Sequence, residues 1–226
     1  AKAGANVAII GRNKKKNNEA LEKIRGLGAK AISVQSDVRC RLSCKSAIKE
    51  VRRELGQINI LINNAGTTVR KPAERLTEKE WRLVLDTNLT STFIWSINCY
   101  PEFKKAGGGK ILNNGSMLSL FGSPWGSAYG ASKGGVVQLT RSHATAWASD
   151  NIQVNCFLPG WIDTPLTEKA RTNMPDLDEK ILSRTPIKRW GKPQDLEGIA
   201  IFLASEASNF ITGTAIPVDG GFSISI

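Results

Sequence analysis

Three residues in the middle of the chain have the types and spacing needed for acid–base chemistry on an alcohol or a ketone. Tyr129 follows Ser116 by thirteen positions, and Lys133 follows Tyr129 by four. Residues four apart share one face of a helix, so the phenol and the ammonium can meet. An ammonium about 4 Å away, at an effective dielectric of about 20, stabilises a phenolate by on the order of 4 kcal/mol. That is enough to lower the pKa of a phenol by about 2 to 3.

Such a phenolate could take the proton of an alcohol while hydride leaves the carbon, and the Ser116 hydroxyl could hydrogen-bond the same substrate oxygen. A tyrosine and a lysine at this spacing are common, however, and an exposed pair on a helix surface is the alternative. The residues around them decide between the two interpretations.

Short runs of β-branched residues alternate with longer amphipathic stretches, which predicts a Rossmann-type α/β domain with a doubly wound, mostly parallel sheet and helices on both faces. The predicted strands cover 6–10, 30–35, 58–62, 110–114, 152–157 and 215–218. The predicted helices cover 17–27, 42–55, 79–105 with a break near Asn88, 127–149 and 194–204. We expect one domain over 1–226, in which the irregular stretch at about 158–190 forms a substrate lid.

Residues 2–5 resemble the last turn of a helix with its glycine cap. In a doubly wound sheet the first strand and a Gly-rich turn precede that helix, and the first strand is central in the order 3-2-1-4-5. We therefore expect further chain before residue 1.

Polar and glycine residues follow three of the predicted strands directly. Asp37 follows 30–35, the run Asn63-Asn64-Ala65-Gly66 follows 58–62, and Pro159-Gly160 follows 152–157. The carboxyl ends of parallel strands meet at one edge of the sheet, where open α/β folds bind their ligands. Glycine at that edge lets backbone approach a nucleotide closely.

In this order and at this spacing, these motifs resemble the short-chain dehydrogenase/reductase family in its compact form. The resemblance implies that Tyr129 is the acid/base, that Lys133 lowers its pKa and holds the nicotinamide ribose, and that Ser116 orients the substrate oxygen. It implies that Asn88 orders a water next to Lys133. The implied coenzyme contacts are Asp37 and Val38 at the adenine, Asn64, Ala65 and Gly66 along the coenzyme, and Pro159, Gly160, Ile162 and Thr164 at the nicotinamide carboxamide.

Two departures from the family pattern stand out. The family's Gly-rich pyrophosphate turn is not in the chain, and Asn113-Asn114-Gly115 is more polar than the β-branched run usual before the serine. NAD sites of this fold carry, at the end of the second strand of the sheet, a carboxylate that takes both ribose hydroxyls. In this chain the corresponding position follows the predicted strand 6–10 and reads Ile10-Gly11-Arg12, without a carboxylate. A guanidinium at Arg12 suits a 2′-phosphate, which favours NADP over NAD as the coenzyme.

Arg70 and Lys71 come a few residues after the Asn63–Gly66 run, and two cations there would suit an anionic substrate. This segment and the stretch 184–191 are similar to gluconate 5-dehydrogenases and related sugar-acid dehydrogenases of the family, and Trp161 is a candidate pocket wall. We therefore expect an oxidoreductase acting on a small polar substrate, with Arg70 and Lys71 binding a carboxylate. A 3-oxoacyl-[acyl-carrier-protein] reductase and a non-catalytic nucleotide-binding scaffold are the alternatives.

The composition excludes several other classes of protein. Lysine and arginine outnumber aspartate and glutamate by 31 to 20, but the basic groups lack the aromatic interleaving of a nucleic-acid surface. Four cysteines and one histidine indicate neither a disulfide scaffold nor a metal site. No apolar run reaches membrane-spanning length, and no signal peptide is visible, so we expect a cytoplasmic protein. The family resemblance suggests a homotetramer.

Overall fold

The structure, a computed structural model, describes residues 1–173 and 176–225. Its strands are all parallel and form two hydrogen-bonded groups, β1-β2 and β3-β4-β5-β6. The strands are β1 Val7–Gly11, β2 Ala31–Gln35, β3 Ile60–Asn63, β4 Gly109–Asn114, β5 Ile152–Pro159 and β6 Ala215–Val218. All six predicted strands are therefore present. Within the described residues β3 pairs only with β4, and its Ile60 and Ile62 are 37% and 48% exposed.

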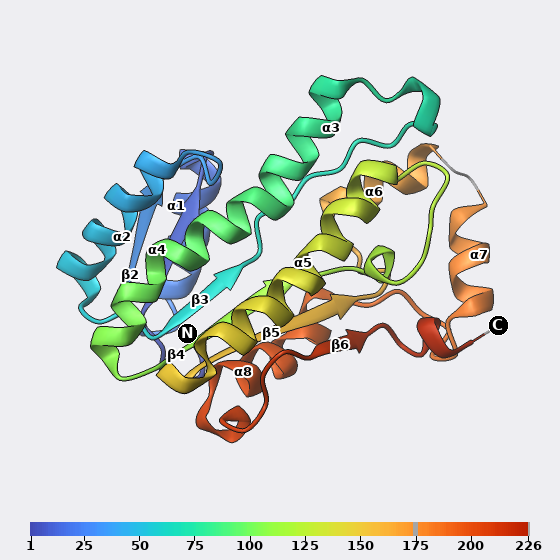
Figure 1. Ribbon diagram of the computed structural model, residues 1–226. Helices are drawn as coiled ribbons and strands as arrows, with labels where there is room; N and C mark the ends of the chain where they lie inside the picture. Colours follow the sequence, from blue (N-terminus) through green and yellow to red (C-terminus); the bar gives the residue numbers. More distant parts are fainter. Residues whose placement is uncertain (174–175, 226) are drawn as a thin grey trace.

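The helices cover both faces of the four-stranded group (Figure 1). α4 (Ser91–Ala106) and α5 (Ser127–Trp147) pack on one face, and α8 (Glu197–Ala204) packs on the other. α1 (Lys14–Arg25) and α2 (Arg41–Leu55) accompany β1 and β2.

Alternation along β4 explains the two-sided core. Ile111 packs in the cluster with Ile94 and Trp95 of α4, whereas Leu112 packs in the cluster with Leu203 of α8. Successive side chains of a strand point to opposite faces, so neighbouring apolar residues serve both layers. Ile111, Leu112 and Leu203 are fully buried, and each such side chain contributes about 1.5 to 3 kcal/mol of hydrophobic stabilisation.

The predicted helix over 79–105 is broken near Asn88, as expected. α3 (Glu78–Leu85) ends in a π-helical turn, η2 (Asp86–Thr90), which leads into α4. Thr77 and Glu80 form a capping box at the start of α3, which fixes where this helix begins.

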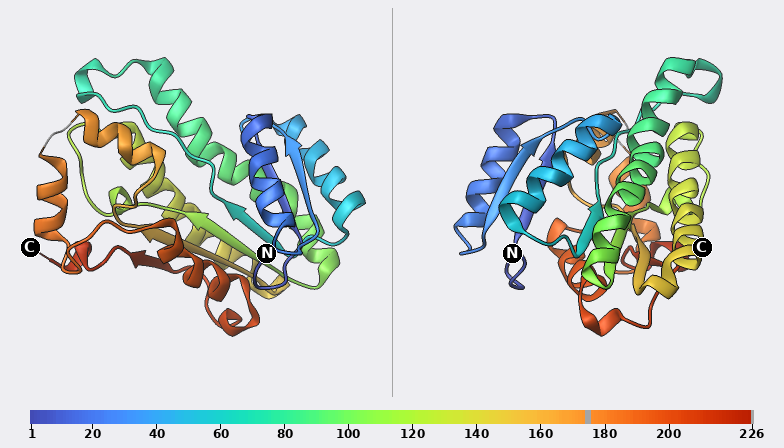
Figure 2. Two further views of the ribbon diagram at one scale, coloured as in Figure 1. Left: turned by 180° about the vertical axis from the view of Figure 1, so that it is seen from behind. Right: turned by 60° about the vertical axis from the view of Figure 1, so that its left-hand side comes forward.

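The stretch at 158–190, predicted to be irregular, contains two helices. They are α6 (Pro165–Asn173) and α7 (Leu177–Arg184). Pro165 at the first position of α6 and the acidic residues in the first turn of α7 are helix-start signals that the interpretation as a loop overlooked. Trp161 and Trp190 pack against the buried side chains of Ala170, Leu177 and Ile181. The strands β3, β4, β5 and β6 point toward the side of the molecule where α6 and α7 lie (Figures 1 and 2).

Within the described ranges, no helix combines the length and apolar character that crossing a bilayer requires.

Candidate active site

Residues from successive strand ends gather at the carboxyl edge of the sheet. β3 and β4 pair with Asn63 opposite Asn113, and β4 and β5 pair with Asn114 opposite Phe157. Asn64, Ser116 and Gly160 follow these strands within a few residues. The parallel register therefore brings the predicted motifs to the same edge.

Ser116, Tyr129 and Lys133 meet at this edge. The backbone N–H of Leu118 donates to Ser116 Oγ (3.2 Å), so Ser116 caps the short helix that follows β4. The Ser119 hydroxyl donates to the carbonyl of Lys133 (2.9 Å), which joins that helix to α5. Lys133 Nζ lies 5.7 Å from the centre of the Tyr129 ring. The spacing of four residues does place phenol and ammonium on one helix face.

The electrostatics of the pair differ from the expectation. Burial raises the pKa of Tyr129 above its usual value, while the hydrogen bond with Ser116 and the positive charge of Arg70 lower it in part. Lys133 is not among the groups that shift this pKa. Its Nζ donates instead to the backbone carbonyl of Asn114 (2.5 Å), and burial lowers its own pKa to about 8. In this state Lys133 is bound to Asn114 rather than to the phenol, and the expectation that Lys133 depresses the pKa of Tyr129 stays a prediction.

The side chain of Asn88 is fully engaged with protein groups. Its Oδ1 accepts from the N–H of Thr67 (2.8 Å), and its Nδ2 donates to the Thr67 carbonyl (2.9 Å) and to Ser132 Oγ (2.9 Å). Asn88 lies in the π-helical turn, a distortion that is frequent at functional sites. It fastens the segment after Gly66 to α5, which is a positioning contact that the sequence did not predict.

The residues after β1 and β2 form the part of the edge predicted to bind adenosine. Asp37 accepts from Arg39 through both carboxylate oxygens, with the shortest contact at 2.7 Å. The Arg39 guanidinium, together with the charge of Arg12, lowers the pKa of Asp37 to about 2. The exposed Arg12 guanidinium makes no ion pair with the residues described. Val38 packs against the core, and its carbonyl accepts from Trp95 Nε1 (3.1 Å).

Two buried polar atoms at this edge lack a hydrogen-bond partner among the described residues, Ser36 Oγ and Asn114 Oδ1. Buried polar groups are normally satisfied, so these atoms indicate a polar ligand. A dinucleotide offers hydroxyls, amides and phosphates along one molecule. The residues present therefore fit a nicotinamide dinucleotide: Arg12 would hold its 2′-phosphate, and Tyr129 and Lys133 would hold its nicotinamide half.

The predicted carboxamide contacts lie on the segment that follows β5. The N–H of Gly160 donates to Val218 O (3.0 Å), and Ile162 bridges to Gly191. A Cβ on Gly160 would come within 2.6 Å of Asp219 Cα. Packing against the chain after β6 therefore already requires a glycine here, and the expected contact with the coenzyme stays a prediction. Thr164 bonds with Thr167 at the start of α6.

Of the predicted substrate residues, Arg70 interacts with the charge of the phenol, and Lys71 forms an ion pair with Glu80. Arg70 is partly buried, burial lowers its pKa, and its charge interacts with Tyr129. Lys71 Nζ donates to Glu80 Oε1 (2.5 Å), which lowers the pKa of that carboxyl to about 2. Lys71 is thus ion-paired with the capping residue of α3, and its expected binding of a substrate carboxylate stays a prediction. Trp161 packs edge-on to Trp190, with ring centres 5.7 Å apart.

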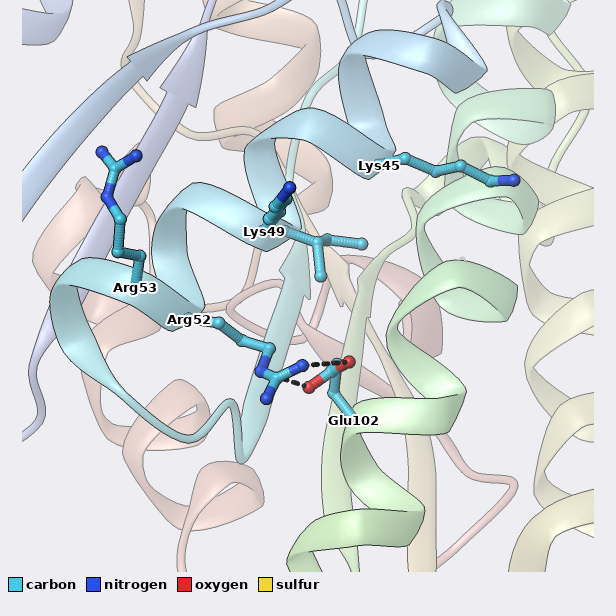
Figure 3. A pocket seen from close by; sticks show the side chains of 6 residues that line it. Lys45, Lys49, Arg52, Arg53 and Glu102 are labelled. Carbon is cyan, nitrogen blue, oxygen red and sulfur yellow. Dashed lines mark hydrogen bonds and ion pairs between the residues drawn. The ribbon is translucent and has the colours of Figure 1, made fainter.

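A cavity of about 430 Å³ lies elsewhere, between α2 and α4. It is lined by Lys45, Ile48, Lys49, Arg52, Arg53 and Glu102. Arg52 pairs with Glu102 (3.0 Å), whereas Lys45 and Arg53 point in different directions (Figure 3). The charged ends therefore do not converge on one ligand. No group of three or more His, Cys, Asp or Glu that could hold a metal occurs in the part of the chain described.

Comparison with known proteins assigns the family. A family model described as enoyl-(acyl carrier protein) reductase matches residues 1–223. The 2-dehydro-3-deoxy-D-gluconate 5-dehydrogenase of Dickeya dadantii (strain 3937) is 40% identical over 97% of this chain and 87% of the relative. The 3-oxoacyl-[acyl-carrier-protein] reductase of Thermotoga maritima is 37% identical over 99% of this chain and 90% of the relative. The crystal structure of a gluconate 5-dehydrogenase from Burkholderia cenocepacia J2315 in complex with NADP and tartrate superimposes with a TM-score of 0.95, at 34% identity, over 100% of this chain and 88% of that one.

The chain belongs to the short-chain dehydrogenase/reductase family. The predicted Rossmann-type fold is confirmed, as is the predicted class of NAD(P)-dependent oxidoreductase acting on CH–OH groups. Sugar-acid dehydrogenases are among the proteins that it resembles.

Sequence reasoning missed three partners that define this site. Arg39 pairs with Asp37, Glu80 pairs with Lys71, and Ser132 bonds to Asn88. The Thr77-x-x-Glu80 pattern of a capping box was the available signal for Glu80. The short spacing of Asp37 and Arg39 was the available signal for their ion pair. Nothing in the sequence points to Ser132.

Proposed function

We propose that this protein is an NADP-preferring dehydrogenase that interconverts a secondary alcohol and a ketone on a sugar acid. The observation that carries the proposal is the meeting of Ser116, Tyr129 and Lys133 at the carboxyl edge of the sheet, with the charge of Arg70 beside the phenol. Each of these residues has a separate task.

Tyr129 exchanges the proton of the substrate oxygen, and Ser116 hydrogen-bonds that oxygen. With its pKa raised, Tyr129 is protonated near neutral pH and suited to give its proton to the oxygen of a ketone. In the oxidative direction its phenolate takes the hydroxyl proton, which requires a nearby positive charge. Arg70 supplies part of that charge, and the buried ammonium of Lys133 supplies more if its Nζ turns from Asn114 toward the phenol. The nicotinamide coenzyme, when bound, supplies the hydride acceptor or donor.

Lys133 also holds the nicotinamide ribose, and Asn88 keeps the backbone after Gly66 in place against α5. Arg12 selects NADP, because its guanidinium pairs with a phosphate better than with a neutral ribose hydroxyl. Asp37, Val38, Asn64 and Ala65 line the remaining length of the coenzyme. Pro159, Gly160, Ile162 and Thr164 cover its carboxamide.

Arg70 binds the substrate carboxylate. A partly buried guanidinium next to the acid/base fixes an anionic substrate with its reacting carbon at Tyr129. The sugar-acid names of the Dickeya and Burkholderia proteins agree with a carboxylate-bearing substrate. Lys71 contributes by anchoring the segment to α3 through Glu80.

The segment at 158–190 acts as the substrate lid of the single domain 1–226. Its helices α6 and α7 lie beyond the strand ends (Figure 1). A cavity of about 160 Å³ separates part of it from β6, and Trp161 is one of the lining residues. Closure of such a segment excludes water from the reacting atoms.

The assembly that we propose is a homotetramer in the reducing cytoplasm. Phe93 on α4, Ile201 on α8 and Phe210 are 40%, 48% and 105% exposed in the single chain, which favours their burial between copies. All four cysteines are free thiols, in keeping with a reducing compartment. The mass in sedimentation equilibrium tests the tetramer, and a monomer would refute it.

The test is steady-state turnover of NADP⁺ or NAD⁺ with gluconate, its 2-keto-3-deoxy derivative, glucose and a 3-hydroxyacyl thioester. We expect reduction of NADP⁺ with a sugar acid, and a KM for that acid raised about 10-fold or more in Arg70→Ala. Arg75→Ala, an exposed arginine of the same segment, is the matched control.

Turnover of the thioester alone would favour the alternative reaction, the one named for the Thermotoga relative. Binding of the coenzyme without turnover of any compound would favour a nucleotide-binding scaffold. Either outcome would overturn the sugar-acid proposal.

A further inference from the structure

Asn114 is the last residue of β4, and it lies between the buried Lys133 and the turn after β3. Asn114 Nδ2 donates to Asn64 Oδ1 (2.8 Å), and the backbone carbonyl of Asn114 accepts from Lys133 Nζ (2.5 Å). Asn114 therefore touches a residue of the expected acid–base group and a residue of the expected coenzyme segment at once.

The neighbouring residue shows which face Asn114 uses. Asn113 is fully buried, accepts from Asn63 Nδ2 (2.9 Å) and donates to Thr140 Oγ1 of α5 (2.9 Å). Successive side chains of a strand point to opposite faces. The Asn114 side chain thus points away from α5 and remains outside this buried network.

The amide of Asn114 is only half satisfied. Its Nδ2 has Asn64 as partner, but its Oδ1 is buried and has no hydrogen-bond partner among residues 1–173 and 176–225. In the structure Nδ2 faces Asn64 and Oδ1 faces away from it. The atom left over is an acceptor, so it needs a donor.

We propose that Asn114 Oδ1 accepts a hydrogen bond from the nicotinamide half of the coenzyme, and that Asn114 is thereby a coenzyme-positioning residue. The inference rests on the proposed function. Phosphates cannot supply the bond, because at neutral pH their oxygens accept. The donors on this half of the coenzyme are the ribose hydroxyls and the carboxamide N–H, and Asn114 lies within two residues of Ser116 along the chain.

The Asn114 side chain can be replaced without removing the bond that holds Lys133, so its contribution to coenzyme binding can be measured separately. Lys133 bonds to the backbone carbonyl of Asn114, so replacing the Asn114 side chain leaves that bond in place. The variant Asn114→Leu is close in volume and removes both amide groups. We expect its Kd for NADP⁺ to rise about 3- to 10-fold.

The experiment is calorimetric titration of the complete protein with NADP⁺ and with the analogue that carries an acetyl group in place of the carboxamide. Asn114→Ala accompanies Asn114→Leu in case the leucine disturbs folding, and thermal unfolding is recorded for both. Asn98→Leu is the matched control, because Asn98 Nδ2 bonds within its own helix to Ile94 O.

Weakened binding of both ligands in the Asn114 variants, with Asn98→Leu unchanged, would support a ribose contact. Weakened binding of NADP⁺ alone would support a carboxamide contact. Unchanged binding in a folded variant would overturn the inference. A wild-type protein that binds NADP⁺ but oxidises no sugar acid would refute the proposed function and leave this comparison valid. Absence of NADP⁺ binding by the wild type would refute both.

Discussion

Replacing Lys133 by methionine is expected to stabilise the protein near neutral pH. Lys133 is 3% exposed, and burial lowers its pKa from 10.5 to about 8. Within the described residues its ammonium has no carboxylate partner, and its one hydrogen bond goes to the carbonyl of Asn114. The protein therefore keeps a charge in its interior that folding alone does not favour.

The size of the effect follows from the difference between the folded and unfolded pKa of Lys133. A tenfold change in proton affinity corresponds to about 1.4 kcal/mol, so the charged lysine destabilises the folded state by about 3 kcal/mol at neutral pH. Methionine has a similar volume and no charge, but it leaves the Asn114 carbonyl without a donor, at a cost of about 1 to 2 kcal/mol. The net gain expected for Lys133→Met is about 1 to 2 kcal/mol.

The sign of the pH dependence is also determined. The folded-state pKa lies below the unfolded one, so the unfolded chain binds more protons between about pH 8 and pH 10.5. The penalty on the wild type is complete below that window and disappears as pH rises through it. The advantage of Lys133→Met should therefore shrink by about 2 kcal/mol between about pH 7 and about pH 10.

Denaturant unfolding of wild type and variant at these two pH values measures the difference, with the exposed Lys79→Met as control. A variant that is less stable than wild type at about pH 7, or a difference independent of pH, would refute the reasoning. Loss of turnover in the more stable variant would show that the lysine is kept for function.

Two further predictions concern coenzyme choice and the lid. In Arg12→Glu the carboxylate repels a 2′-phosphate and can accept ribose hydroxyls, so the ratio of kcat/KM for NADP⁺ to that for NAD⁺ should fall about 10-fold or more; an unchanged ratio would assign the choice to other residues. Arg171 stacks on Trp190 at 3.8 Å and pairs with Asp163 (2.9 Å) and Asp178 (3.1 Å). Arg171→Ala should therefore raise the rate of proteolysis within 158–190 and the substrate KM without changing the Kd for NADP⁺, and equal cleavage rates would contradict a lid held by this residue.

Much of the site could be predicted because it depends on local spacing and on parallel strands. Tyr129 and Lys133 share a helix face, and Asn64, Ser116 and Gly160 follow strands whose carboxyl ends meet at one edge. These relations follow from helix periodicity and sheet direction, which the residue pattern carries.

The partners of long charged side chains could not be predicted in the same way. Lys133 bonds to Asn114 rather than to Tyr129, and Lys71 reaches Glu80 across nine positions. Such pairings depend on burial and on rotamers that only the folded chain defines. The helices α6 and α7 were missed because both are short and their start signals were overlooked. Their buried contacts are largely with each other and with Trp161 and Trp190.

The most direct test of the account is the absorbance of reduced nicotinamide when the complete protein, NADP⁺ and a sugar acid are mixed, with Tyr129→Phe measured beside the wild type. We expect reduction of NADP⁺ by the wild type and a loss of at least about 100-fold in kcat for Tyr129→Phe, since only the proton-exchanging hydroxyl is removed. The Kd of the variant for NADP⁺ should stay within a few-fold of wild type. Equal turnover by the two proteins would contradict the assignment of Tyr129 as the acid/base.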